Sequence, residues 1–414
     1  MIEFSKFELA NGLRVLVHED QSTQMLAVNI VYDVGSKDES PDKTGFAHLF
    51  EHLMFGGSVN APDFDEPLQF AGGESNAFTN NDFTNFYDIV PAANIETVLW
   101  LESDRMQRLN INSKTLNIQQ KVVVEEFKET CLNQPFGDAW HHLSEMAFEI
   151  HPYRWPTIGL KPSHIADAQL TDVQSFFETY YNPNNAVLVI AGNITLEKAM
   201  ALCTKWFGDI PSGYRNSRNL PAEPIQSKFK SKQIENGVPV DAMYMAFHMP
   251  GRLEKDYYAA DLISDILANG KSSRLYNKLF KELQLFSSID AYISGQIDPG
   301  LFIVEGKFME NQDHDQAIDA VWKELNNLSE NGVQEQELTK LKNKVESALA
   351  FSESSILNKA MNLAYFEIIG NANLINEEAN LYQRVTVDDI QRVAQMIFQK
   401  KNCSQLIYKR ANLT

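Results

Sequence analysis

Runs of apolar residues and periodic apolar positions divide the first half of the chain into strands and helices. Residues 7–17 carry two alternating runs around Asn11-Gly12, a dipeptide typical of a two-residue hairpin turn. Residues 25–34 form a continuous apolar run that predicts a buried strand, and residues 75–90 form two further strand-like runs. A last strand is expected at residues 185–190. Helical periodicity marks the other segments, at residues 45–55, 95–109, 114–129, 170–181 and 196–207.

The second half repeats this order of elements after a proline-rich segment. Residues 211–227 contain three prolines and no apolar period, and we place a linker at residues 214–227. A buried strand follows, then a helix that ends at Asn269-Gly270, and then strand-like alternation. The expected elements of this half are residues 240–249, 257–268, 287–308, 315–330, 335–351, 385–398 and 404–408.

Length and composition allow two cores. The chain has 414 residues, of which 44% are hydrophobic, and single cores stop growing at roughly 250–300 residues. Together with the repeat, this predicts an α+β protein of two homologous domains, each a mostly antiparallel sheet covered by helices. The domains are expected at residues 1–213 and 228–414.

The segment His48-Leu49-Phe50-Glu51-His52 carries the candidate chemistry. Residues at i, i+3 and i+4 of a helix share one face, so both imidazoles and the carboxylate are expected together. Two neutral imidazoles on one face can bind zinc, and the nearby carboxylate can take a proton from a water. The order His-x-x-Glu-His is used by inverted zinc peptidases. The alternative is a structural or solvated role for each histidine.

The repeat places this motif in the first half only. An offset of 213 residues aligns Gly57 with Gly270, which end corresponding helices. The three chemical positions of the first copy then fall on residues that do not form a zinc-ligand set, namely Asp261, Ser264 and Asp265. We therefore expect metal ligands in the first domain and none in the second.

A third ligand has to come from another segment, since catalytic zinc sites commonly take three protein ligands. The helix expected at residues 114–129 offers Glu125, Glu126 and Glu129. Glu126 and Glu129 lie on the helical face of Val122, whereas Glu125 points elsewhere. All three could instead be ordinary solvated charges, and the pattern alone leaves that choice open.

Several motifs together resemble the pitrilysin/insulinase family of inverted zinc metallopeptidases. The similarity spans essentially the whole chain and is closer to the short bacterial subunits that are similar to mitochondrial processing peptidase. The matching segments are NGLRVLV, HLFEHLMFGGS, GGESNAFT, VVVEEF, HPYRWPTIG, YYNPNNAVLVIAGN and SSRLYNKL.

The resemblance implies a zinc-dependent endopeptidase. It implies His48, His52 and Glu126 as ligands of one Zn²⁺ per chain, with Glu51 as general base. It also implies two homologous α+β domains and a closed chamber made from two subunits. Co²⁺ or Mn²⁺ also suits a site of two histidines and one glutamate, although the ligand types favour zinc.

The segment 75–79 matches the family's edge strand beside the metal. The resemblance implies that Asn76, Ala77 and Phe78 bind substrate there. An extended peptide can add to such an edge through main-chain hydrogen bonds, with little demand on its sequence. The alternative is a plain strand of the sheet.

The sequence departs from the family pattern in two ways. The family commonly has a glutamate seven residues before the zinc glutamate, in the outer shell, and Gln119 stands there. A neutral amide can still orient a ligand, but zinc affinity is expected to differ. Full family sites also take an arginine and a tyrosine, seven residues apart, from the half facing the zinc. Phe280 and Ser287 occupy those positions.

This second departure predicts a split site. Arg274 and Tyr276 lie nearby at the wrong spacing, and we interpret them as structural. We expect a homologous partner subunit to supply the Arg/Tyr pair in a heterodimer, with a homodimer as the alternative. The competing functional hypotheses are a non-catalytic zinc-binding scaffold and a peptide-binding subunit of a larger assembly.

Charge and cysteine content refine the expected partners and location. The net charge of −19 argues against nucleic acid or an anionic membrane as the main partner. The 3 cysteines form no CxxC or Cys/His cluster, so a cysteine metal site is not expected. The first residues lack an apolar signal-peptide core and no run of about 18 apolar residues occurs. The cytoplasm is therefore the expected location.

Overall fold

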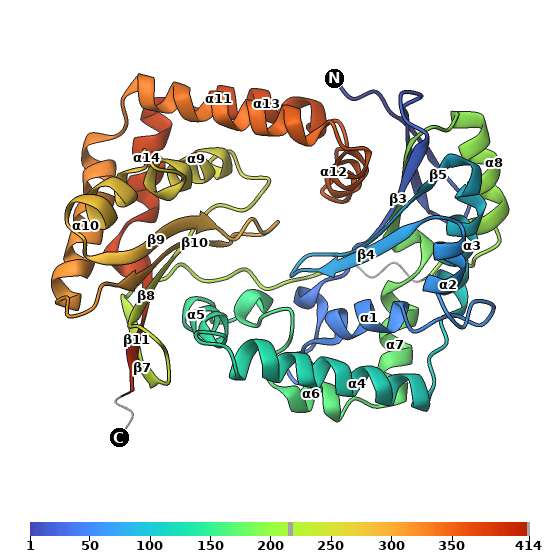
Figure 1. Ribbon diagram of the computed structural model, residues 1–414, viewed down its shortest axis with the longest axis horizontal. Helices are drawn as coiled ribbons and strands as arrows, with labels where there is room; N and C mark the ends of the chain where they lie inside the picture. The colour runs from blue at the N-terminus through green and yellow to red at the C-terminus, as the bar shows by residue number, and fades with distance from the viewer. Residues whose placement is uncertain (214–217, 412–414) are drawn as a thin grey trace. The chain divides into compact units, whose positions relative to one another are not determined.

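The computed structural model describes residues 1–213 and 218–411, which divide into two compact units (Figure 1). Unit 1 consists of Met1–Lys128, Trp155–Leu220 and Ala350–Glu377. Unit 2 consists of Glu129–Arg154, Pro221–Leu349 and the chain from Glu378 onward. Of the predicted linker, residues 214–217 lie outside the described residues.

Unit 1 contains a six-stranded, mostly antiparallel sheet in the order β1-β2-β6-β3-β5-β4. Only β2 and β6 pair in parallel, and β4 forms one edge of the sheet. The strands are β1 (Ser5–Glu8), β2 (Arg14–Glu19), β3 (Met25–Tyr32), β4 (Glu74–Thr79), β5 (Thr84–Pro91) and β6 (Ala186–Gly192). The predicted hairpin, the buried strand and the paired strands of the first half are all present.

Unit 2 repeats this topology with one strand fewer. Its sheet has the order β7-β11-β8-β10-β9, in which only β7 and β11 pair in parallel. The strands are β7 (Lys230–Asn236), β8 (Ala242–His248), β9 (Phe286–Ile293), β10 (Leu301–Phe308) and β11 (Cys403–Arg410). In this order the five strands correspond one by one to β2, β6, β3, β5 and β4 of unit 1, and β1 has no counterpart among the described residues of the second sheet. The predicted fold class, two homologous α+β domains, is therefore confirmed.

Helices cover one face of each sheet because their apolar stripes pack on alternate strand residues. In unit 1, Leu26, Val28 and Ile30 of β3 lie in one core with Leu49 of α1 and Val123 of α4. The helices of this unit are α1 (Phe46–Met54), α2 (Asp65–Phe70), α3 (Ile95–Arg108), α4 (Ser113–Phe127), α6 (Pro162–Ala166), α7 (Leu170–Tyr180) and α8 (Leu196–Phe207).

The sheet of unit 2 is covered in the same way. Phe302 and Val304 of β10 pack with Ile263 of α9 and Val393 of α14. The helices of this unit include α9 (Tyr257–Ala268), α10 (His314–Asn331) and α14 (Val387–Ile397). The division between the units falls within α11 (Glu335–Ser352) and α13 (Leu374–Gln383). Within the described part of the chain, every helix is too short or too polar to cross a membrane.

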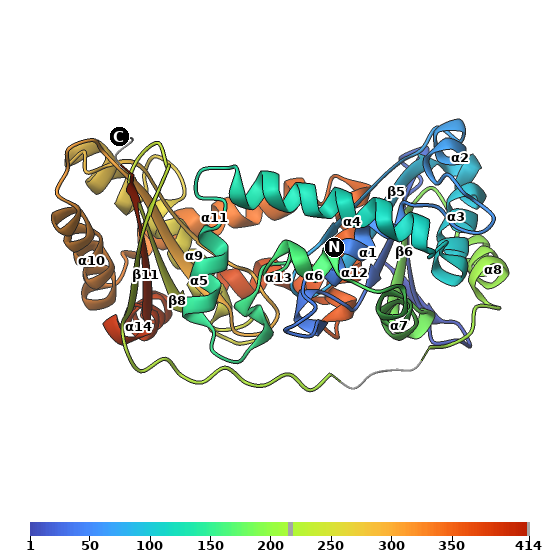
Figure 2. The ribbon, with the colours of Figure 1, turned by 90° about the horizontal axis from the view of Figure 1, so that it is seen from below.

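The other face of each sheet is covered by a helix from the opposite half of the chain. Leu363 of α12 (Ile356–Ile368) packs against Val31 and Val189 of the first sheet. Helix α5 (Ala139–Ala147) covers the second sheet, as Figures 1 and 2 show. Its Leu143 is buried in one cluster with Ala242 and Ala246 of β8. The sequence pattern did not predict either helix. Each predicted domain, 1–213 or 228–414, is one unbroken stretch of the chain, whereas each compact unit consists of three separate stretches.

Replacing Leu363 by Ala is expected to destabilise unit 1 by about 2–5 kcal/mol, because it leaves a cavity under α12. Leu363 is fully buried in a cluster with β3 and β6. The neighbouring Asn362→Ala, at a partly exposed position, is the control, expected to change stability by less than about 0.5 kcal/mol. Hydrogen exchange at the β3 and β6 amides measures the effect. Equal exchange in both variants would contradict the packing role of α12.

Candidate metal centre

Helix α1 presents His48, Glu51 and His52 from its partly exposed face. Its buried residues are Phe46, Ala47, Leu49, Phe50, Leu53 and Met54. Since these apolar positions face the core, the three polar positions at i, i+3 and i+4 are left together on the other face. The helix ends at Met54, immediately before Phe55 and the predicted stop at Gly56-Gly57.

Helix α4 supplies the third group. Asn112 caps its start by accepting hydrogen bonds from the amides of Lys114 and Thr115. Gln120 is buried and donates to the carbonyl oxygens of Ile165 and Ala168, at 2.8 and 3.0 Å, which ties the helix to the body of unit 1. The helix ends at Phe127 rather than at the expected residue 129, and a π-helical turn follows.

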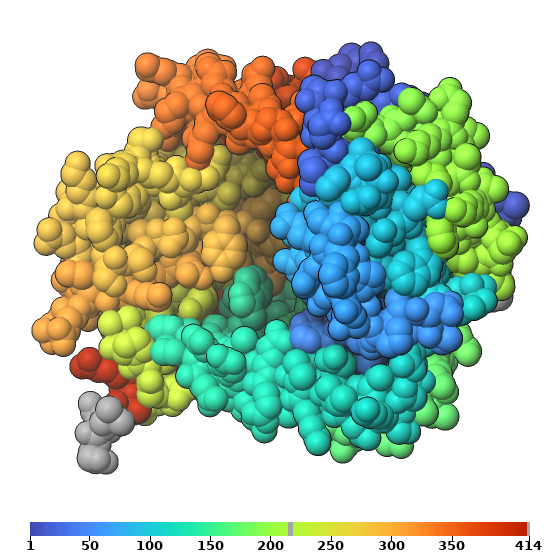
Figure 3. Space-filling model, turned by 45° about the vertical axis from the view of Figure 1, so that its right-hand side comes forward, coloured from blue at the N-terminus to red at the C-terminus, as the bar shows by residue number. Residues whose placement is uncertain are grey.

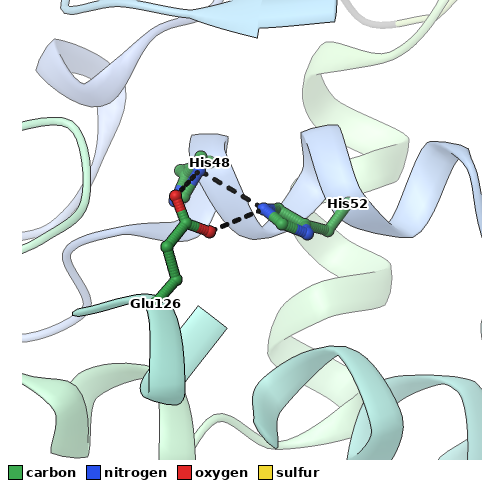
Figure 4. Close-up of side chains that lie close together, drawn as sticks. All are labelled: His48, His52 and Glu126. Carbon is green, nitrogen blue, oxygen red and sulfur yellow. Dashed lines mark hydrogen bonds and ion pairs between the residues drawn. The ribbon is translucent and has the colours of Figure 1, made fainter. Parts of the chain in front are cut away.

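The structure distinguishes the three acidic candidates of this segment. Glu126 points at the two histidines of α1, as Figure 4 shows. The side chain of Glu125 is 71% exposed and pairs with Lys128 at 2.7 Å. Glu129 is also exposed. Figure 3 shows α4, in teal, on the surface of the molecule, which agrees with these exposures.

The three side chains offer one ligand atom each, all within 4.8 Å of one another. The Nε2 atoms of His48 and His52 lie 3.3 Å apart, and Glu126 approaches His48 through Oε1, at 3.6 Å, and His52 through Oε2, at 3.2 Å. Tetrahedral coordination with bonds of about 2.1 Å separates neighbouring donors by about 3.4 Å. Within the described residues, no other group of at least three histidine, cysteine or acidic side chains converges in this way. The donor set therefore fits zinc.

The protonation states also suit a metal. Burial lowers the pKa of the His48 imidazole, against the opposing effect of the Glu126 carboxylate, so the ring is neutral at pH 7. The hydrogen bond with His52 lowers the pKa of the Glu126 carboxyl. Metal ligands bind as neutral imidazole and ionised carboxylate, and these shifts favour both forms.

Glu51 is oriented by a residue of the neighbouring strand. The Thr79 hydroxyl, at the end of β4, donates a hydrogen bond of 2.7 Å to Glu51 Oε2. The sequence pattern missed this role of Thr79, since nothing in a strand's alternation indicates which helix its last residue faces. The hydrogen bond thereby fixes one oxygen of the Glu51 carboxylate, and Glu51 itself lies on the same turn of α1 as the two histidines.

Strand β4 has an open edge. The amide of Asn80 donates to the Phe83 carbonyl at 3.1 Å, which sets the alternation of the β4–β5 ladder. By this alternation the main-chain groups of Ser75, Ala77 and Thr79 point away from β5. The Ala77 amide accordingly bonds to the Asn76 side chain rather than to the ladder.

The two faces of β4 differ. Ala77 packs against the core that contains α1, on the side of Thr79 and Glu51. Phe78 lies on the other face, where its ring contacts Phe83 at 5.9 Å and remains 39% exposed. The structure thus places Asn76, Ala77 and Phe78 on the predicted edge strand, and their substrate-binding role stays a prediction.

Gln119 is a partly exposed residue on α4, about two turns before Glu126. Its side chain makes no hydrogen bond to any described residue. Its predicted outer-shell role therefore stays a prediction. The adjacent Gln120, which was not singled out from the sequence, is the amide that anchors the helix.

The positions of the family's Arg/Tyr pair are occupied by a ring that stacks on a neighbour and by an exposed serine. Phe280 stacks on Tyr276 at 4.9 Å, and the Ser287 hydroxyl donates to the Lys307 carbonyl. Arg274 pairs with Glu337 at 2.9 Å and also donates to a backbone carbonyl, as the structural interpretation expects.

The second copy of the motif helix has taken other contacts. Asp261 of α9 accepts a hydrogen bond from the Tyr382 hydroxyl, and Asp265 accepts one from Asn269. These positions do not join any converging donor group among the described residues. The expectation that ligands occur in the first domain only agrees with this geometry.

Two family models match successive parts of the chain. "Insulinase (Peptidase family M16)" matches residues 14–159, which include the three converging side chains. "Peptidase M16 inactive domain" matches residues 167–345. Together the two models span most of the chain.

Relatives and a solved structure agree with these matches. The zinc protease PqqE of Helicobacter pylori is 27% identical over 411 residues, 97% of this chain and 91% of that protein. A probable mitochondrial-processing peptidase subunit beta of Arabidopsis thaliana is 25% identical over 308 residues, 71% of this chain and 57% of that protein. The crystal structure of a protease from Helicobacter pylori has a TM-score of 0.92 at 26% identity, covering 99% of this chain and all of that one.

Replacing Glu126 by Gln is expected to weaken zinc binding by about 100-fold or more, a larger loss than removal of an outer hydrogen-bonding partner causes. The amide loses the charge and one of the two oxygens that face the histidines. Glu125→Gln is the matched control, because this carboxylate is one residue away and faces solvent. Chelator competition measures both affinities, and equal zinc affinity in the two variants would exclude Glu126 as a ligand.

Proposed function

Because the chain belongs to the insulinase family, peptidase family M16, we propose that it is a zinc-dependent endopeptidase subunit that hydrolyses extended peptides. The observation that carries the proposal is the convergence of His48, His52 and Glu126 donors at 3.2–3.6 Å. The zinc protease relatives support the peptidase class, and the donor spacing supports zinc as the metal.

His48, His52 and Glu126 would hold the metal, and Glu51 would act as general acid and base. A zinc ion bound there supplies Lewis-acid chemistry, which polarises a peptide carbonyl and acidifies water. Glu51 takes a proton from the attacking water and delivers it to the leaving amine. The hydrogen bond from Thr79 leaves the second Glu51 oxygen available for this transfer.

The substrate would bind as an additional strand along β4. The outward main-chain groups of Ser75 and the outward carbonyl of Ala77 would form hydrogen bonds with an extended peptide, and the Ala77 amide would exchange its bond to Asn76 for one to the peptide. Such pairing makes little demand on peptide sequence. Asn76 and Phe78 project from one face of the strand, opposite Ala77, and would contact substrate side chains. This mode of binding requires an extended segment with free main-chain groups, which favours unfolded peptides.

A homologous partner subunit would complete the site. Peptide hydrolysis develops negative charge on the carbonyl oxygen, and positioned donors stabilise it. Phe280 and Ser287 cannot supply a cation or a phenol. A partner that carries an Arg/Tyr pair would supply these groups in a heterodimer.

Replacing Glu51 by Gln is expected to reduce peptide cleavage by about 100-fold or more while zinc content stays unchanged, because only proton transfer is lost. Cleavage of oxidised insulin B chain, followed by mass spectrometry, measures the rate, and metal analysis measures zinc. Glu66→Gln, at an exposed position of α2, is the control. Unchanged activity in Glu51→Gln would refute the mechanism. A wild-type complex that binds zinc without cleaving peptides would support the scaffold function instead.

The purified chain alone is expected to bind zinc but to cleave the B chain slowly, because the oxyanion donors are missing. Removing one such donor typically costs a factor of about 100–1,000 in kcat. Copurification from the native host, followed by assays with and without the copurified partner, measures the difference. Full turnover by a symmetric dimer of this chain would exclude the split site.

A further inference from the structure

We propose that the turn Ser36–Glu39 positions both halves of the site, with Glu39 holding the metal-binding helix and Lys37 holding the peptide-binding strand. The inference rests on the proposed function and concerns residues that contact neither metal nor substrate. Three successive charged side chains of this turn contact three different parts of unit 1. Lys37 contacts the tip of the β4–β5 hairpin, Asp38 contacts Arg218, and Glu39 contacts the start of α1.

Glu39 caps helix α1 from a distance. Its two carboxylate oxygens accept hydrogen bonds from the amides of Gly45 and Ala47 at 2.9 and 2.8 Å. The first amides of a helix have no partners within the helix, and a side chain at the N-cap position commonly satisfies them. Gly45 occupies that position and has no side chain to do so. Glu39 therefore replaces the missing cap.

The glycine is required by its surroundings. Gly45 has a φ of +91°, and a Cβ atom there would lie 2.8 Å from the Ile158 carbonyl oxygen. A serine, aspartate or asparagine cap cannot occupy this position without strain. The cap has to come from another part of the chain, and Glu39 is only 7% exposed while making it.

The chemistry of this carboxylate indicates a positional role. A buried carboxylate is costly unless its oxygens are hydrogen-bonded. Burial raises the pKa of the Glu39 carboxyl well above its usual value, and the hydrogen bonds from the amides of Ala47 and Gly45 offset only part of that rise. A carboxylate at a helix N-terminus also interacts favourably with the helix dipole. His48 lies on the first turn of α1, so its ring moves with this end of the helix.

Lys37 holds the tip of the β4–β5 hairpin. Its ammonium lies 2.7 Å from Asp82 Oδ1, and the two side chains are only 3% and 5% exposed. The amides of Ser36 and Lys37 donate to the carbonyls of Asn80 and Asn81 at 3.1 and 3.0 Å. The hairpin tip follows Thr79 directly, so these contacts fix the strand end that orients Glu51.

The backbone at the start of the turn has no room for a side chain. A Cβ atom on Gly35 would lie 2.4 Å from the Asn81 carbonyl oxygen. The turn and the hairpin tip are therefore in direct backbone contact, which makes their spacing stiff.

Asp38 fixes the turn itself. Its carboxylate accepts two hydrogen bonds from Arg218, at 2.7 and 2.9 Å, and one from the Gly35 amide. The same guanidinium pairs with Asp33 at 2.9 Å. Bidentate pairs of this kind restrict orientation as well as distance. These contacts with Arg218 fix the position of the turn, from which Lys37 contacts the hairpin tip and Glu39 contacts the helix.

Because the two contacts act on different elements, they are expected to affect different measurements. Weakening the Glu39 cap should change metal binding, since two of the three donors are on α1. Weakening the Lys37–Asp82 pair should change peptide binding, since β4 is the substrate edge. A merely structural role would lower both together with stability.

The first test replaces Glu39 by Gln, which has only one acceptor oxygen for the two amides. Zinc affinity is expected to fall about tenfold, as for loss of an outer-shell partner. The visible absorption of the Co²⁺-loaded full chain should change as well, because it reports ligand geometry. Asp42→Asn is the control, since this carboxylate is exposed on the same loop and makes no contact with α1. Zinc affinity and Co²⁺ absorption equal to those of the control would overturn the role of Glu39.

The second test uses the double variant Lys37→Met with Asp82→Asn, which removes both charges together. Anisotropy of labelled oxidised insulin B chain, measured in the full chain with Glu51→Gln, gives the peptide Kd. We expect it to rise on the order of tenfold, because a loosened edge is no longer preorganised, with zinc affinity unchanged. An unchanged peptide Kd, or equal losses in both measurements, would overturn the role of Lys37.

Hydrogen exchange of the wild-type chain provides a test that does not depend on whether a substituted chain folds. The Ala47 amide is expected to exchange slowly, although uncapped first-turn amides exchange rapidly. Rapid exchange at Ala47 would overturn the Glu39 cap. Failure of the wild-type chain to bind zinc would instead refute the proposed function, so the two failures are distinguishable.

Discussion

Three side chains can bind one zinc ion only where their donor atoms converge to about 3.4 Å, and this spacing couples α1 to α4. Helix α1 meets part of the requirement by itself, because residues four apart lie on one face. The third donor, on Glu126, depends on how α4 is held. The buried Gln120 and the apolar stripe of α4 provide that hold, and they leave Glu126 facing His48 and His52.

The same sheet order occurs in both units, yet only one copy has the converging donors. In unit 1 the helix beside the edge strand carries two imidazoles, whereas Asp261 and Asp265 of α9 are engaged by Tyr382 and Asn269. The fold therefore does not need the metal ligands. A duplicated unit can lose them while keeping its sheet, its helix and its core, because the ligands lie on the partly exposed face of the helix.

Each half of the chain supplies a helix to the unit formed mainly by the other half. Helix α12 covers the first sheet and α5 covers the second. A sheet with apolar residues on both faces needs covering on both, so neither compact unit is complete within its own half of the sequence. Glu126 lies just before the segment that passes into unit 2.

The sequence alone was sufficient for most strands, most long helices and the motif His48–His52, because these features follow from local periodicity and spacing. The offset between the halves also indicated which copy lacks ligands. Tertiary structure decided the rest. Helical periodicity set Glu125 apart but could not choose between Glu126 and Glu129, because the packing of α4 and the point at which it ends decide which residue faces α1. It could not reveal α5 and α12 as sheet covers, nor the hydrogen bond from Thr79 to Glu51 or the cap from Glu39. Those contacts join residues that are distant in the sequence and close in the folded chain, and the pattern of residues along the sequence does not contain that proximity.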